Sequence, residues 1–168
     1  MSERSAAPGG LALIESLVNT LDIETGADSL DSAEGRGRFG ITEAGLDDAR
    51  DLRESLRAAL LAHAGHPPHR PVTPLGALLA PAPLYVSVDD RDGSAALTPA
   101  DDGPLLCKVA AAVAEALVAG TWTRLKACEA ETCHWAYYDR SPAGRGRWCS
   151  MQVCGARAKM RRYRAKGP

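Results

Sequence analysis

The chain has 168 residues, of which 45% are hydrophobic and 24% are charged, a composition that suits one ordinary domain or a modest domain with a small appendage. It has no run approaching the ~20 apolar residues of a membrane span. Its first ten residues also lack the basic and then apolar pattern of a secretory signal. We therefore expect a cytoplasmic protein without membrane contact. The net charge of −1 is unevenly distributed, because residues 1–120 carry nine Lys and Arg against eighteen Asp and Glu, whereas residues 121–168 carry eleven against three.

Two helices are predicted in the first part of the chain. Residues 11–21 place five aliphatic side chains at helical spacing, and the acidic, turn-rich residues 22–40 are predicted to form a long loop. Thr42 can cap a second helix over residues 43–63, whose leucines and alanines form one stripe. Charged residues of this helix, such as Glu54, are predicted to lie on its solvent side.

A proline-rich segment then ends this helix. Residues 63–74 contain four prolines and a glycine, which predicts an irregular linker. The segment also contains three histidines, but no carboxylate accompanies them at ligand spacing. We therefore interpret His63, His66 and His69 as linker residues rather than as a metal site.

A hairpin and a third helix follow. Residues 84–88 and 94–98 have the composition of two short strands joined by a tight turn. Residues 102–104 (Asp-Gly-Pro) are typical of a helix start, and Gly120 marks the end of that helix. Its side chains are almost all apolar, so we predict that it is the central buried helix of the larger domain, with Cys107 as a small buried hydrophobic residue.

The domain boundary is predicted near Gly120, where the charge changes sign and the other cysteines begin. Residues 1–120 would form a sensor or assembly domain, and residues 121–168 a small metal-bound module. The predicted fold class is α+β: a mainly helical N-terminal domain with a short β-hairpin, followed by a zinc-bound β-hairpin and helix of treble-clef-like form.

Four cysteines form two Cys-x4-Cys pairs that are fifteen residues apart: Cys128, Cys133, Cys149 and Cys154. Disulfides are not expected in the reducing cytoplasm. The 41 residues from Cys128 onward are too few to form a stable hydrophobic core without a metal or another cross-link. One structural Zn²⁺ held by four thiolates would provide this cross-link and stabilise the folded module. His134 is an alternative ligand. Five aromatic residues are predicted to form a small core around the metal: Trp135, Tyr137, Tyr138, Trp148 and Tyr163.

The C-terminal residues are strongly basic. Ser150 can cap a helix over residues 150–166. One side of this helix carries Arg157, Arg161 and Arg164, and roughly the opposite side carries Lys159, Arg162 and Lys166. The preceding loop adds Arg140, Arg145 and Arg147. Together these residues predict a surface that grips phosphates; the alternative is a solvated basic face.

These motifs resemble a known family. The stretch RLKACEAETCHWAYYDRSPAGRGRWCSMQVCGARAKMRRYRAK is similar to the CGNR-type zinc finger, and residues 17–21 (Leu-Val-Asn-Thr-Leu) resemble the opening of the domain that commonly precedes it, described as a putative stress-induced transcription regulator. The resemblance implies zinc ligation by the four cysteines and binding to DNA. Ala156 stands where the family motif has asparagine, so no role of that amide carries over. Arg157 remains, either to brace the metal loop or to contact nucleic acid.

The preferred functional hypothesis is a bacterial, stress-related transcription regulator located at the nucleoid. Its N-terminal domain would sense a small-molecule effector or mediate assembly, for instance as a homodimer on paired half-sites, and its zinc finger would bind duplex DNA. A second hypothesis is RNA binding, with Trp135 and Tyr137 stacking on bases. A third is a protein-interaction module whose basic surface docks on an acidic partner, including this protein's own N-terminal domain. No catalytic motif is evident, and an enzyme is not expected.

Overall fold

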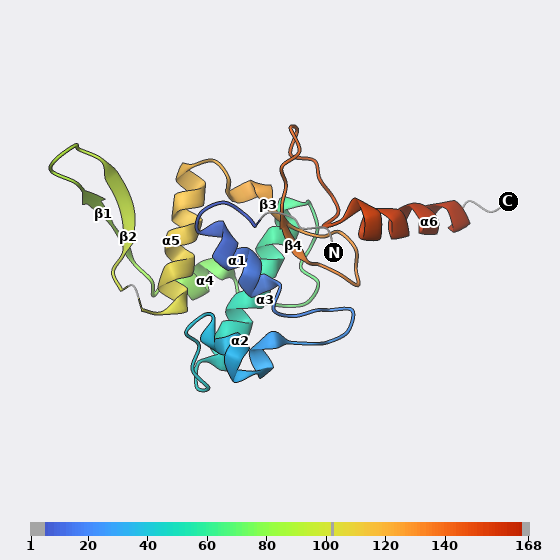
Figure 1. Cartoon of the computed structure of the whole chain (residues 1–168), viewed down its shortest axis with the longest axis horizontal. Coiled ribbons are helices and arrows are strands. Elements are labelled where there is room, and N and C mark those ends of the chain that lie inside the picture. Colours follow the sequence, from blue (N-terminus) through green and yellow to red (C-terminus); the bar gives the residue numbers. More distant parts are fainter. Residues whose placement is uncertain (1–5, 102, 166–168) are drawn as a thin grey trace.

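The computed structural model describes residues 6–101 and 103–165, and in this part of the chain it shows six α-helices and two small β-sheets (Figure 1). The predicted α+β class is confirmed. The helices are α1 (Leu11–Val18), α2 (Ala33–Gly37), α3 (Leu46–His63), α4 (Leu75–Leu79), α5 (Leu105–Val118) and α6 (Ala156–Ala165). The sheets are two antiparallel hairpins, β1 (Leu84–Val88) with β2 (Ala95–Pro99) and β3 (Leu125–Ala127) with β4 (Ala136–Tyr138). The structure also contains two 3₁₀ turns, η1 (Ser29–Asp31) and η2 (Trp122–Arg124), and one π-helical turn, η3 (Met151–Gly155).

Helix α3 is the centre of the molecule, because α1, α4 and β3 all contact it. Ten of its eighteen residues are buried, including Leu56 and Leu60, which have no exposed surface. Glu54 is also buried, with 1% exposure, so the prediction that it lies on the solvent side was wrong. The linker covers this side of α3, where His69 Nε2 lies 3.2 Å from a Glu54 oxygen.

Helix α5 is less buried than its apolar sequence predicts. Cys107 and Val109 are buried, as expected of its inner face. However, Leu117 is 60% exposed and Val118 is 80% exposed. The apolar surface of α5 is wider than its contacts with α1, α4 and β2, so the prediction of a central buried helix was wrong, and α3 takes that place.

Helix α1 lies close against α5. Leu11, Ile14 and Leu17 point into the shared core, as the helical spacing predicts. At the start of α1, Gly10 approaches α5 so closely that a Cβ there would lie 2.7 Å from the Ala112 Cβ. A side chain at this position would separate the two helices.

Residues 22–40 are more ordered than the predicted loop. Asp28 caps η1 by accepting a hydrogen bond from the Leu30 N–H (3.0 Å), and Ser32 caps α2 by accepting one from the Gly35 N–H (3.0 Å). Thr42 accepts a hydrogen bond from the Gly45 N–H (3.2 Å) in a turn of its own. Helix α3 therefore starts at Leu46, three residues later than expected.

The β1–β2 hairpin has the predicted place and pairing, with Val86 opposite Leu97. It contacts α5 through β2 and extends from one end of the molecule (Figure 1). Helix α4, in the segment before it, was not predicted. Asp102, part of the expected start of α5, lies outside the described residues, and α5 begins after Pro104.

The base of the C-terminal module is built into the main core. Leu125 of β3 and Ala136 of β4 belong to the same buried cluster as α1 and α3. Helix α6, in contrast, extends away from the body at the end opposite the β1–β2 hairpin (Figure 1). Among the described residues, no helix combines the length and apolar character needed to cross a membrane.

Candidate metal centre and basic surface

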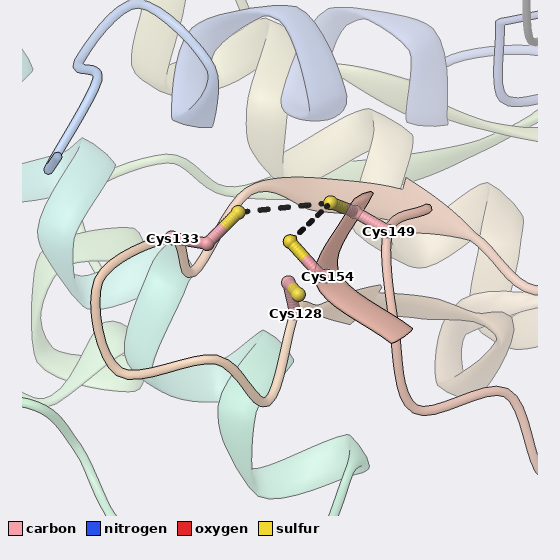
Figure 2. A group of neighbouring side chains, drawn as sticks. All are labelled: Cys128, Cys133, Cys149 and Cys154. Atoms are coloured by element: carbon pink, nitrogen blue, oxygen red, sulfur yellow. Dashed lines mark hydrogen bonds between the residues drawn. The ribbon is translucent and has the colours of Figure 1, made fainter. Parts of the chain in front are cut away.

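The structure brings the four predicted ligands together from two separate loops. Cys128 follows β3 and Cys133 ends the next turn, whereas Cys149 precedes η3 and Cys154 lies within it. The four sulfur atoms lie within 4.8 Å of one another and point toward a common centre (Figure 2). The Cys133–Cys149 and Cys149–Cys154 sulfur distances are 3.6 and 3.7 Å.

These distances fit one zinc ion. With Zn–S bonds of about 2.3 Å, the edges of a tetrahedron of sulfur atoms are about 3.8 Å long. Four thiolates complete the coordination of the metal, so the ion they hold is structural. The chain therefore has one structural zinc site, as the cysteine spacing predicts.

The thiols also influence one another electrostatically. Hydrogen bonds from Cys133 and Cys149 lower the pKa of Cys128 to about 2, and donating to Cys128 raises the pKa of Cys133 to about 12. The hydrogen bond to Cys128 also raises the pKa of Cys149, and burial raises that of Cys154. Thiol ligands bind zinc as thiolates, so metal binding at this site is coupled to the release of protons.

His134, the alternative ligand, has a different place in the structure. Its Nδ1 lies 3.0 Å from the Cys128 carbonyl oxygen, which can only accept, so Nδ1 carries the proton. Its backbone is left-handed, with φ of 46°, and its carbonyl accepts a hydrogen bond from Arg57. His134 thus holds the shape of the first cysteine loop from outside the sulfur cluster.

The second cysteine loop is a wide, π-helical turn. Ser150 caps it by accepting a hydrogen bond from the Val153 N–H (3.3 Å), as predicted. A Cβ on Gly155 would lie 3.1 Å from the Met151 sulfur and 3.3 Å from Trp148 Cδ1, so a larger residue directly after the last ligand would require these side chains to shift slightly. The predicted single helix over residues 150–166 is therefore two elements, and α6 begins at Ala156.

A buried ion pair that the sequence analysis missed supports the metal loops. Lys126 of β3 donates to Asp139 over 2.9 Å, and both side chains are more than 90% buried. Burial alone would raise the pKa of Asp139, but hydrogen bonds from Ser141, Lys126 and the Gly146 backbone hold it well below its ordinary value. The sequence pattern that could have indicated a buried lysine is the position of Lys126 between two apolar residues of a strand.

The zinc module is also hydrogen-bonded to the N-terminal domain. The Asn19 amide pairs with both backbone groups of Ala136, accepting from its N–H (2.7 Å) and donating to its carbonyl (3.0 Å). Arg57, which is fully buried, donates to the carbonyls of Val18 (2.8 Å) and His134 (3.0 Å). Asn19 therefore acts as one more strand partner for β4.

Three histidines also lie at this junction: His63 at the end of α3, and His66 and His69 in the linker. His63 donates from Nδ1 to the Leu125 carbonyl (2.7 Å), and His66 Nε2 lies 3.1 Å from Glu129. Sequence spacing did not reveal these carboxylate partners, because Glu54 and Glu129 come from other elements. The three histidines therefore bond to Leu125, Glu129 and Glu54 of neighbouring elements, an arrangement that differs from a shared metal site.

The aromatic residues do not form the small core that was predicted. Tyr137 is buried and its hydroxyl donates to the Gly146 carbonyl (2.7 Å), and Trp148 packs beside the cysteines. Tyr138 packs against the main core instead, and Tyr163 is 76% exposed on α6. The module relies on the main core for much of its apolar contact.

Three of the nine predicted phosphate-binding residues already have partners. Arg140 donates to the Ala6 carbonyl (2.6 Å), Arg147 pairs with Glu129 (2.7 Å), and Arg157 pairs with Glu24 (2.9 Å). The last pair joins Arg157, near the start of α6, to Glu24 in the N-terminal part of the chain.

Five others are exposed, and their side chains make no ion pair within residues 6–101 and 103–165: Arg145, Lys159, Arg161, Arg162 and Arg164. Lys166 lies outside the described residues. The free cations therefore concentrate on α6.

The fold and the cysteine site together define a zinc-binding protein in which a helical domain precedes a small metal module. The family model described as "Putative stress-induced transcription regulator" (ABATE) matches residues 11–120, well over half of the chain, and the chain belongs to this family. The model described as "CGNR zinc finger" matches residues 124–167. Both matches confirm the resemblance seen in the sequence. No curated protein matches the sequence.

Proposed function

We propose that this protein is a DNA-binding transcription regulator of the bacterial nucleoid whose α6 helix contacts the phosphates of duplex DNA. The main support for the proposal is the exposure of α6. This helix has no buried residue, and four of its exposed cations have no ion-pair partner among the described residues. Phosphate contacts by Lys and Arg supply most of non-specific DNA affinity. The families that the chain matches support a regulatory role.

Duplex DNA is favoured over RNA because one of the two stacking residues that RNA would need is inaccessible. Tyr137 is 4% exposed and its hydroxyl is hydrogen-bonded, whereas Trp135 is 37% exposed. Recognition of single strands relies on aromatic faces that bases can reach. A single half-exposed ring supports this mode poorly.

Docking of the basic surface on the protein's own acidic domain is a weaker candidate. Its support is the pair between Arg157 and Glu24, which are both about half exposed. The rest of α6 is free of such contacts in the described chain. We therefore assign Arg157 to positioning the helix and the other cations of α6 to binding DNA.

The N-terminal domain would bind the effector. A cavity of about 330 Å³ opens between α3, α4 and the start of α5, with Leu52, Leu78 and Leu106 among its walls. Such a mostly apolar cavity with a few polar groups suits a small ligand. A binding role rather than catalysis is part of the proposal, because four thiolates leave zinc no open position for a substrate.

The proposal is tested by measuring the binding of the full-length zinc protein to labelled duplex DNA, single-stranded DNA and structured RNA across a salt series. The double variant Arg161→Ala/Arg162→Ala should bind duplex DNA more weakly, with a salt slope that is less steep by about 0.9 for each lost phosphate contact. Arg91→Ala, at the tip of the β1–β2 hairpin, is the matched control and should bind like the wild type. An unchanged affinity and slope in the double variant, or a preference for RNA, would contradict the proposal.

A further inference from the structure

The β1–β2 hairpin presents an apolar face that is largely uncovered. Residues opposite each other in an antiparallel pair share a face, so Val86 lies beside Leu97, and Val88 beside Ala95. Val86 is 66% exposed and Val88 is 57% exposed. The hairpin packs on α5 through β2 and through Leu84 at its base, but Val86 and Val88 remain exposed beyond that contact and are available to a further packing partner.

A groove runs between this face and α5. It has a volume of about 760 Å³, and Val86 and Leu97 of the hairpin line it together with Ala111 and Val118 of α5. Val118 is 80% exposed. Apolar exposure that is continuous over two elements is typical of a protein-interaction surface.

The exposed stripe of α5 is complementary to itself. Lys108 and Glu115 lie seven residues apart, hence on one side of the helix, and both line the groove. Both are exposed, and neither forms an ion pair within the described residues. Midway between them is Ala111, which is partly exposed and whose small side chain permits the close approach of another helix, whereas the next residue, Ala112, is buried against Gly10 at the start of α1.

We propose that this surface binds a second copy of the chain, with the two α5 helices antiparallel about a two-fold axis near Ala111. In this arrangement Lys108 of each copy faces Glu115 of the other, so the contact is isologous and closed. The adjoining apolar hairpin faces extend the contact and lose their exposure to water. The inference is independent of the proposed DNA binding.

The location of the surface suits a regulator of this shape. The groove and hairpin lie at the end of the molecule opposite α6 (Figure 1). A dimer formed there leaves both basic helices uncovered, at the two outer ends of the assembly. The same chain can thus pair and bind a polyanion at once.

Charge reversal tests the proposal directly. Sedimentation equilibrium of the full-length zinc protein should give twice the 17.7 kDa chain mass. Lys108→Glu and Glu115→Lys each place like charges opposite one another, and each should raise the dimer dissociation constant about tenfold or more. The double variant Lys108→Glu/Glu115→Lys restores opposite charges and should restore the dimer. Lys159→Glu, the same charge change on exposed α6, should have no effect on mass.

Three results would overturn the proposal. The first is a wild-type protein that remains monomeric at concentrations on the order of 100 µM. The second is a dimer whose dissociation constant neither single reversal changes. The third is a double variant that dissociates as readily as the single ones, which would show that Lys108 and Glu115 do not face each other across the axis.

Discussion

The base of the zinc module and its terminal helix are built from the same basic stretch of chain, yet they use charge in opposite ways. In the base, Lys126 is buried against Asp139 and also donates to the Gly144 carbonyl. Arg124 donates to the carbonyls of Asp139 and Ser141. On α6, every described residue is at least partly exposed. The net positive charge of residues 121–168 is therefore larger than the charge available to a binding partner, because Lys126 and Arg124 are hydrogen-bonded within the base of the module.

The two regions also differ in what fixes their shape. The base is held by zinc, by the main core and by a buried ion pair whose remaining polar atoms are hydrogen-bonded. Helix α6 is held at its first turn, by η3 and by the exposed pair of Arg157 with Glu24. We therefore expect changes in the base to affect folding and changes on α6 to affect binding.

The largest effect should come from the metal. Cys149→Ser removes one thiolate, and structural zinc sites in finger peptides contribute about 10–16 kcal/mol of apparent binding energy at neutral pH. The variant should lose its zinc and become sensitive to protease within residues 128–165, while the core of α1, α3 and α5 stays folded. Metal analysis and limited proteolysis measure both outcomes.

Cys107→Ala is the matched control, because Cys107 lies in a separate apolar cluster with Ala82 and Ala110. This variant should retain one zinc per chain. Full zinc content in Cys149→Ser would show that the four-thiolate site is not what holds the module together.

The next largest effect should come from the buried ion pair. Asp139→Asn keeps the size of the side chain but leaves the Lys126 ammonium buried without a counter-charge, which typically costs about 3–5 kcal/mol. The free energy of unfolding, measured in urea with zinc present, should fall accordingly. Glu24→Gln removes the exposed partner of Arg157 and should leave the free energy of unfolding almost unchanged. Equal losses in the two variants would remove the distinction between base and helix.

The smallest effect should be a pH dependence of stability at the domain junction. Burial lowers the pKa values of His63 and His69, against opposing contributions from the Leu125 carbonyl and Glu54. Below the unfolded value of about 6.5 the unfolded chain binds protons that the folded chain does not, so stability is greatest above this pH and falls as the pH decreases through the folded values.

His63→Gln keeps a donor for the Leu125 carbonyl but removes one titrating group. Denaturant midpoints between about pH 7 and about pH 5 should therefore fall less steeply in this variant than in the wild type, with zinc content followed at each pH. Parallel curves would mean that His63 does not couple protonation to folding.

The parts of the fold that were predicted correctly depend on local patterns. The spacing of Leu11, Ile14 and Leu17 identified α1, and two runs of β-forming residues around a tight turn identified the β1–β2 hairpin. The domain boundary near Gly120 stays a prediction, although the base of the zinc module shares the core of the N-terminal domain. Glu54 was misplaced because its partners come from the linker and from neighbouring turns of α3, and helix periodicity does not reveal what covers a polar side.

The sequence by itself determined the four zinc ligands and the basic character of α6. Cysteine spacing reports which thiols lie within reach of one metal, and charge counts require no coordinates. Only the tertiary structure decided which arginines are free. Arg140 meets Ala6 and Arg157 meets Glu24 across more than 130 residues of sequence. Such pairings depend on how the zinc module packs against the main core. The local sequence around an arginine does not determine this packing.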